Sequence, residues 1–154
     1  MPATTLKAFL DSRNVKYTST QHSMAYTAAE VAESVHVKGR DFAKTVIVKI
    51  DGTMAMLVLP ASRRLVLHDL REMLGTDHVR LATEAEFKDA FPDCELGAMP
   101  PFGNLYGMPV YVAASLTDET EIAFNAGTHS EVIKLAYEDF EELVNPTVLD
   151  FVTT

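Results

Sequence analysis

Lys44 is the charged residue best placed to do chemistry, because it lies in the β-branched segment Ala43–Ile50, which is typical of a strand. Side chains alternate along a strand, so Lys44, Val46 and Val48 share one face. At the end of a strand a lysine can extend its ammonium group to water. It can also hold an anion, or the negative charge that develops when an ester carbonyl is attacked. The pattern leaves both interpretations open.

A second candidate segment is the loop Gly97–Gly103, which lies in a stretch rich in proline and glycine, residues 92–109. Glycine permits positive φ and close approach of a ligand to the main chain. Proline lowers the entropy cost of holding one loop shape. Because long ordered loops in compact domains are usually functional, we interpret this loop as part of a binding site; a rigid structural turn is the alternative.

The third candidate segment, Asn125–His129, directly follows a predicted strand. Its small residues allow successive main-chain N–H groups to point at an anion or a carbonyl oxygen. His129 could then shuttle a proton or orient a reacting group. The alternative is a structural histidine that caps or fills the core.

Metal and thiol chemistry are disfavoured by the composition. Cys94 is the one cysteine, so it forms no internal disulfide and no cysteine cluster, and no two of the five histidines have a metal-ligand spacing. We expect no metal and no cofactor, and we interpret Cys94 as a small buried apolar residue.

Secondary-structure signals place these segments in an α+β fold with a mixed, mostly antiparallel sheet. Thr27 with Glu30 and Thr83 with Glu86 form capping boxes at helix starts, and Asp51-Gly52 is typical of a β-hairpin turn. The predicted helices are residues 4–13, 27–34, 65–74, 83–91 and 137–143. The predicted strands are residues 15–20, 43–50, 54–59, 78–81, 110–114, 121–125 and 132–135, and a tail follows. No dinucleotide or P-loop glycine motif is present.

The composition fits a single domain that spans all 154 residues, with 47% hydrophobic and 23% charged residues. The net charge of −9 argues against a general nucleic-acid binder, but residues 1–80 carry a net +3 and residues 81–154 a net −12. A local basic face could therefore form from Lys38, Arg40, Lys44, Arg63, Arg64 and Arg71. We expect a cytoplasmic protein without a membrane span.

Taken together and in this order, the strand Ala43-Lys44-Thr45, the Gly97–Gly103 loop and the Asn125–His129 turn resemble the YbaK/EbsC-type aminoacyl-tRNA deacylases. This family includes the editing domain of bacterial prolyl-tRNA synthetase and its free-standing relatives. The resemblance runs from about residue 4 to residue 145 and implies a compact, barrel-like α+β domain that hydrolyses the ester between a wrong amino acid and tRNA. His129 is more similar to the prolyl-synthetase-type branch than to the cysteine-specific branch.

The resemblance implies that Lys44 and His129 are the catalytic residues. It implies that the substrate is bound by Gly97, Ala98, Met99, Pro100, Pro101, Phe102, Asn125, Gly127 and Thr128. Met24, Tyr26 and Val46 are further candidates to line the pocket. We therefore expect a free-standing, trans-editing deacylase for a small mischarged amino acid. Its partner would be the tRNA acceptor end, and an aminoacyl-tRNA synthetase is a second candidate partner. Two alternatives stay open: a non-catalytic binding module of the same fold, and a hydrolase or binder of another small acyl or nucleotide ligand.

Overall fold

A computed structural model describes residues 4–22 and 27–153. Its helices are α1 (Thr4–Ser12), α2 (Ala28–Ser34), α3 (Leu67–Leu74), α4 (Glu84–Phe87) and α5 (Tyr137–Val144). Its strands are β1 (Tyr17–Gln21), β2 (Ala43–Ile50), β3 (Thr53–Pro60), β4 (Val79–Leu81), β5 (Val110–Ala113), β6 (Glu121–Asn125), β7 (Glu131–Ala136) and β8 (Thr147–Leu149). None of the helices in these ranges is long and apolar enough to cross a bilayer.

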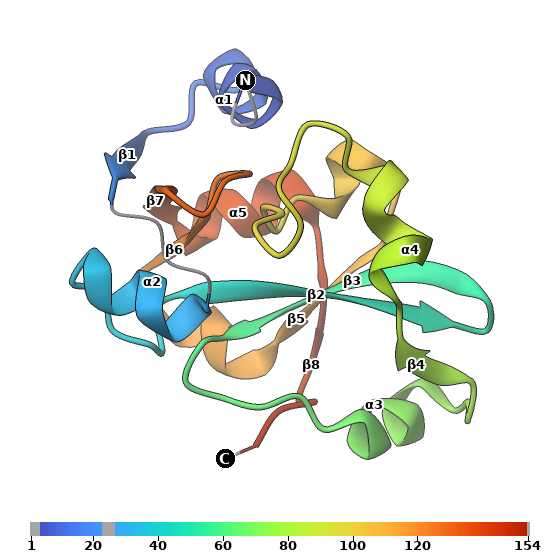
Figure 1. Cartoon of the computed structure of the whole chain (residues 1–154). Helices are drawn as coiled ribbons and strands as arrows, with labels where there is room; N and C mark the ends of the chain where they lie inside the picture. Colours follow the sequence, from blue (N-terminus) through green and yellow to red (C-terminus); the bar gives the residue numbers. More distant parts are fainter. Residues whose placement is uncertain (1–3, 23–26, 154) are drawn as a thin grey trace.

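The strands form two sheets (Figure 1). One has the order β4-β2-β3-β5-β8, in which β3, β5 and β8 run parallel, and the other has the order β1-β7-β6 with antiparallel pairs throughout. A parallel bridge between Phe42 and Ala123 joins the start of β2 to β6. The predicted α+β fold with mostly antiparallel pairing is confirmed. The described strands lie in two joined sheets and do not close into a barrel.

The hairpin of β2 and β3 is the central element and has the predicted turn. Ala43 pairs with Pro60 at one end and Ile50 with Thr53 at the other. Asp51 and Gly52 both have positive φ, 50° and 84°, as a two-residue turn that matches the strand twist requires. Because the register is fixed along its whole length, each side chain of β2 is assigned to one face of the sheet.

Alternation along β2 divides the apolar core into two main parts. Ala43 and Ile47 pack into a large cluster with residues from α1, α5 and the Gly97 loop. Val46 and Val48, on the opposite face, pack with Leu57 and with residues of α3 and the C-terminal segment. A smaller third cluster lies between α2, Phe42 and Ala123.

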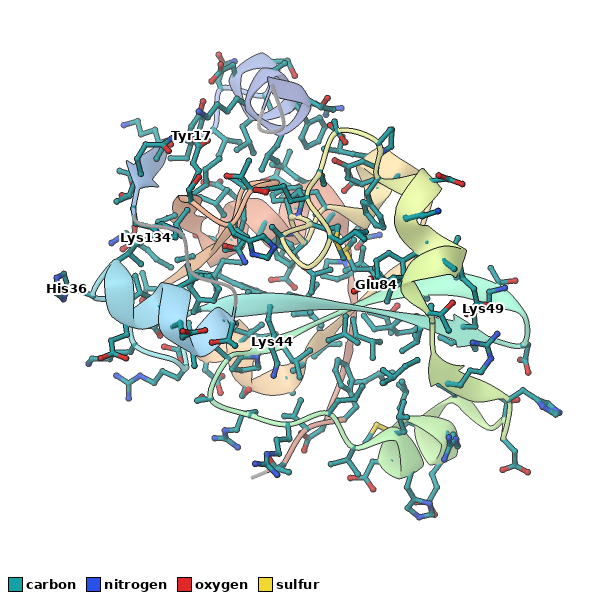
Figure 2. All side chains as sticks on the ribbon, in the orientation of Figure 1. Tyr17, His36, Lys44, Lys49, Glu84 and Lys134 are labelled. Carbon is teal, nitrogen blue, oxygen red and sulfur yellow. The ribbon has the colours of Figure 1, made fainter. Side chains whose placement is uncertain are left out.

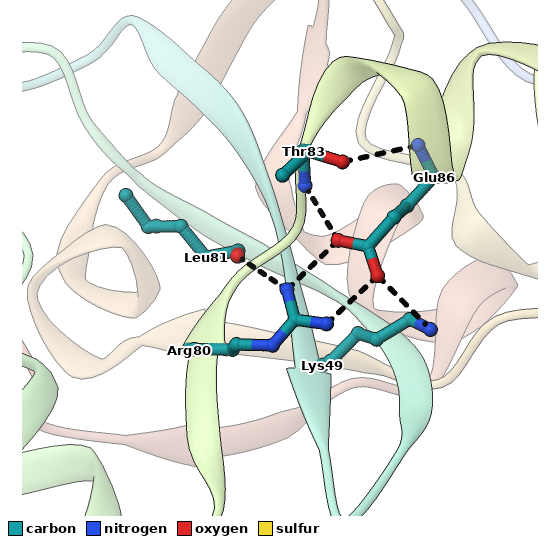
Figure 3. A network of polar contacts seen from close by, with 5 residues as sticks. All are labelled: Lys49, Arg80, Leu81, Thr83 and Glu86. Atoms are coloured by element: carbon teal, nitrogen blue, oxygen red, sulfur yellow. Dashed lines mark hydrogen bonds and ion pairs between the residues drawn. The ribbon is translucent and has the colours of Figure 1, made fainter.

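Both predicted capping boxes are present. At the start of α4, the Glu86 carboxylate accepts hydrogen bonds from the Thr83 main-chain N–H at 2.9 Å and from both Arg80 terminal nitrogens at 2.8 and 2.7 Å (Figure 3). The Lys49 ammonium adds an ion pair at 3.2 Å. These donors, Arg80 foremost, lower the pKa of Glu86 below its ordinary value. The network therefore fixes α4 to the far ends of β2 and β4.

The C-terminal segment differs from the predicted tail. Residues Thr147–Leu149 form β8 parallel to β5, and Val152 bridges to Leu65. Phe151 is fully buried. The strand was missed because its residues are mostly exposed and show no apolar alternation.

Candidate active site

Lys44 and Asn125 both lie near the seam where a parallel bridge joins the start of β2 to β6. From the parallel Phe42–Ala123 bridge, both residues lie two positions further along their strands. Side chains two apart share a face, and Phe42 and Ala123 both pack into the cluster beneath α2. Lys44 and Asn125 therefore project from the same side of the seam, the side that α2 covers.

The Lys44 ammonium is a partly desolvated cation with a second cation beside it. Burial and the neighbouring Arg64 guanidinium both lower its pKa. Within residues 4–22 and 27–153, neither the Lys44 ammonium nor the Arg64 guanidinium forms a hydrogen bond or an ion pair. Figure 2 labels Lys44 near the start of β2. Two adjacent cations without a carboxylate partner form a site that an anion would stabilise.

Asn125 is a buried polar side chain that is only 8% exposed. In the described part of the chain its Oδ1 atom has no hydrogen-bond partner. A buried amide oxygen left without a donor costs free energy, so such a group in a folded protein calls for an explanation. A donor group of a bound substrate beside Lys44 would satisfy it.

The Gly97 loop was expected to line the substrate pocket with its side chains, but these side chains are buried. Ala98, Met99, Pro100, Pro101 and Phe102 are all buried. The Phe102 ring packs edge-on against the rings of Phe9, Phe124 and Phe140.

The Met99 and Phe102 side chains thus lie in the large core cluster, on the opposite face of β2 from Lys44. In this structure their side chains anchor the loop instead of lining an open pocket beside Lys44. The loop can still offer its main-chain groups.

Main-chain hydrogen bonds join the loop to the Asn125–His129 turn. The Glu95 N–H donates to the Gly127 carbonyl at 2.8 Å, and the Gly127 N–H donates to the Ala98 carbonyl at 2.9 Å. Gly127 adopts a φ of 96°, which strongly favours glycine. The two glycine-containing segments singled out from sequence therefore form one continuous substructure.

His129 is held by the residues just before Gly97. Its ring is only 7% exposed, and its Nε2 atom lies 2.8 Å from the Leu96 carbonyl oxygen. Its main-chain N–H donates to the Glu95 carboxylate at 2.9 Å. Gly97 has a φ of 86°, and a Cβ added there would lie 3.3 Å from His129 Cε1. Sequence reasoning missed Glu95, since an exposed acidic loop residue carries no distinguishing signal.

His22 and Ser130 extend the turn towards β1. The His22 N–H donates to the Ser130 carbonyl at 2.9 Å, and the Thr128 hydroxyl lies 3.3 Å from the Ser130 hydroxyl. Sequence reasoning assigned neither His22 nor Ser130 a role. Met24 and Tyr26, two predicted lining residues, lie outside the described residues. Val46 packs its side chain into the cluster on the α3 side of β2.

Three of the six predicted basic residues, Arg40, Arg63 and Arg71, already have partners. Arg63 donates to the Thr153 carbonyl at 2.7 Å, and Arg71 donates to the Val79 carbonyl through two nitrogens at 3.1 and 2.9 Å. Arg40 lies 3.9 Å from Asp41 and 4.0 Å from Glu119. Lys44 and Arg64 are therefore the basic pair best placed to meet an anion at the seam.

The remaining reactive groups lie elsewhere. Burial raises the pKa of the Cys94 thiol to about 11, and its sulfur lies 3.3 Å from the Tyr106 hydroxyl, so Cys94 stays a thiol at neutral pH. In the described ranges, one group could hold a metal ion: His68, Asp69 and Glu72 on the surface of α3. A hollow of about 710 Å³ between Asp51 and Arg71 lies at the far end of β2 and includes none of the predicted site residues.

Comparison with known proteins shows the family of the chain. The family model described as an aminoacyl-tRNA editing domain matches residues 22–143. The multifunctional Ser/Thr-tRNA deacylase ProXp-y of Escherichia coli strain K12 is 30% identical over 115 residues, which cover 71% of this chain and 68% of that protein. The family-model match, residues 22–143, spans Lys44, the Gly97 loop and the His129 turn, the three segments that carry the resemblance.

Two solved structures show the same fold. A protein described as a candidate trans-editing enzyme for prolyl-tRNA synthetase superposes with a TM-score of 0.84 and 20% identity, over 99% of this chain and 98% of that one. A hypothetical protein superposes with a TM-score of 0.85 and 21% identity, over 96% of this chain and 99% of that one. From the matched family model and the curated relative, the chain belongs to the aminoacyl-tRNA editing domain family.

Proposed function

We propose that the protein is a trans-editing aminoacyl-tRNA deacylase that hydrolyses the ester of a small mischarged amino acid, with the catalytic site at the β2–β6 seam. The observation that carries this proposal is the position of Lys44 and Asn125, each two residues beyond the Phe42–Ala123 bridge. In the described residues the Lys44 ammonium and the Asn125 Oδ1 atom have no hydrogen-bond partner. Family membership supplies the reaction class. The proposal is supported by the cation and the buried amide at the seam, two groups that can stabilise an oxyanion and bind a substrate.

Hydrolysis of an aminoacyl ester needs only modest catalysis, because the ester is already activated. Water attacks the ester carbonyl, the carbonyl oxygen becomes negatively charged, and the ribose oxygen leaves with a proton. Lys44 would stabilise the charge that develops on the carbonyl oxygen, or hold a phosphate of the terminal nucleotide together with Arg64. The Asn125 amide would bind the substrate at the same face. No protein nucleophile is required, which agrees with the protonated, half-buried Cys94.

The Gly97 loop would contribute to selectivity for small amino acids through its main chain, since its Met99 and Phe102 side chains face the core. The Gly97 loop is anchored by buried side chains, so it yields little to a larger substrate. One surplus methylene in a rigid pocket costs about 1–3 kcal/mol, or about 10- to 200-fold in rate. The curated relative is named for Ser- and Thr-tRNA, and both amino acids are small.

The decisive experiment is single-turnover deacylation of one tRNA charged in turn with alanine, serine, threonine and phenylalanine. We expect hydrolysis of at least one small ester, slow hydrolysis of the phenylalanyl ester, and loss of most activity in Lys44→Ala. Lys49→Ala is the matched control, because Lys49 lies on the same strand but pairs with Glu86 at the far end. Binding of every substrate without turnover would contradict the proposal, as would equal rates for alanyl and phenylalanyl esters.

A further inference from the structure

The orientation of His129 is set by hydrogen bonds that determine which ring nitrogen carries the proton. The Leu96 carbonyl oxygen can only accept a hydrogen bond, and it lies 2.8 Å from His129 Nε2. In the neutral ring the proton must therefore sit on Nε2, and Nδ1 carries the lone pair. A neutral His129 can accept a hydrogen bond through Nδ1 but cannot donate one there.

Glu95 holds the histidine from a second side. Its carboxylate accepts the His129 main-chain N–H at 2.9 Å, its own N–H donates to the Gly127 carbonyl at 2.8 Å, and its carbonyl accepts the Ala98 N–H at 3.0 Å. One residue thus links the loop, the turn and the histidine. The adjacent Gly97, without a Cβ, lets the imidazole lie against the loop.

We infer that Glu95 is a positioning residue for His129, and that the Leu96 carbonyl fixes His129 as the Nε2-protonated tautomer, so that neutral His129 is not a hydrogen-bond donor at Nδ1 during deacylation. This inference rests on the proposed function. With Nε2 bonded to the Leu96 carbonyl and no proton on Nδ1, the neutral ring cannot donate a hydrogen bond to the carbonyl oxyanion. Stabilisation of the carbonyl oxyanion is then left to donors such as Lys44 and main-chain N–H groups.

The positioning role is tested with Glu95→Ala, Glu95→Gln and the control Glu138→Ala, which removes an exposed carboxylate on α5. We expect Glu95→Ala to lower the maximal single-turnover rate about tenfold with little change in the substrate concentration at half-maximal rate, since one hydrogen bond to a charged group is lost. Glu95→Gln keeps an acceptor oxygen and should restore most of the rate. Equal losses in the alanine and glutamine variants would overturn the positioning role, and so would a normal rate in Glu95→Ala.

Nitrogen NMR of the His129 ring tests the tautomer without any need for turnover. At about pH 8, above the ordinary pKa of imidazole, we expect the protonated signal on Nε2 and the unprotonated signal on Nδ1. Glu95→Ala should shift both signals, whereas Glu138→Ala should leave them in place. A proton on Nδ1 in the neutral ring would overturn the tautomer assignment. If the protein hydrolyses no aminoacyl-tRNA but the ring shows this tautomer, the proposed function fails and the structural part of the inference stands.

Discussion

Replacing Gly97 with alanine should destabilise the protein in two ways, by straining the backbone and by placing a new Cβ against His129. Gly97 has a φ of 86°, and the new Cβ would lie 3.3 Å from His129 Cε1 and 3.7 Å from Nε2. The first distance is shorter than an ordinary van der Waals contact, so the ring has to move by a few tenths of an ångström. That movement stretches the 2.8 Å hydrogen bond between Nε2 and the Leu96 carbonyl.

The expected cost has two parts. Alanine in a left-handed conformation loses about 1–2 kcal/mol of unfolding free energy relative to glycine. Weakening a buried hydrogen bond adds about 0.5–1.5 kcal/mol. Gly52→Ala is the matched control, because Gly52 has a φ of 84° and its added Cβ would have no neighbour within 4 Å. For a chain of this size each kcal/mol corresponds to about 2–4 °C in Tm, so Gly97→Ala should unfold a few degrees below Gly52→Ala.

Thermal unfolding and single-turnover deacylation, measured on the same variants, test whether the contact with His129 adds to the cost of backbone strain. We expect Gly52→Ala to lose stability only, and Gly97→Ala to lose more stability and about tenfold in rate. In a His129→Ala background the extra loss of stability from Gly97→Ala should disappear, because the contacted ring is gone. The reasoning is refuted if Gly97→Ala costs no more than Gly52→Ala, or if the extra loss persists without His129.

Three further predictions concern Lys44, Glu131 and His129. Lys44→Met should abolish most deacylation. It should leave Tm unchanged or about 1–3 °C higher, because it removes a partly desolvated charge beside Arg64. A large fall in Tm would show that Lys44 is structural. Burial raises the pKa of Glu131, but hydrogen bonds from Lys7, at 2.6 Å, and from Ser19 bring it below the ordinary value. That stabilisation is present above the ordinary carboxyl pKa and disappears as pH falls below it. In denaturant titrations, Glu131→Gln should therefore lower the free energy of unfolding by about 1–3 kcal/mol near pH 7 and by less near pH 3. Equal losses at both pH values would contradict this. His129→Ala should lower the maximal rate more than it weakens substrate binding, and a normal rate with a lowered Tm would make His129 purely structural.

The elements that local sequence determines were predictable. The β2–β3 hairpin has a typical turn dipeptide and strands with alternating side chains. Each capping box pairs a threonine with the glutamate three residues later. The three segments of the candidate site were also identified from residue type. They could be identified because each has a distinctive residue type: a lysine in an apolar strand, glycines in a proline-rich loop, and a histidine after small residues in a turn.

What could not be predicted depends on contacts between distant segments. The placement of Lys44 and Asn125 at one seam follows from the Phe42–Ala123 bridge, which no local pattern encodes. Phe102 was expected beside the substrate, but its ring packs among three other aromatic rings, because an apolar residue in a glycine-proline loop can face either the core or the pocket. Glu95 was overlooked because its role depends on main-chain groups about thirty residues further along the chain.

The hydrogen bonds between the Gly97 loop and the His129 turn also determine how this region opens. The main-chain N–H groups of Glu95, Gly127 and His129 all bond from one segment to the other. Neither segment can detach without breaking all three bonds, so their amide hydrogens should exchange with solvent through one cooperative opening and share one free energy. These bonds join residues about thirty positions apart, so we expect the loop to gain them later than the local contacts of the hairpin. The candidate active site is therefore completed late in folding, as a single unit.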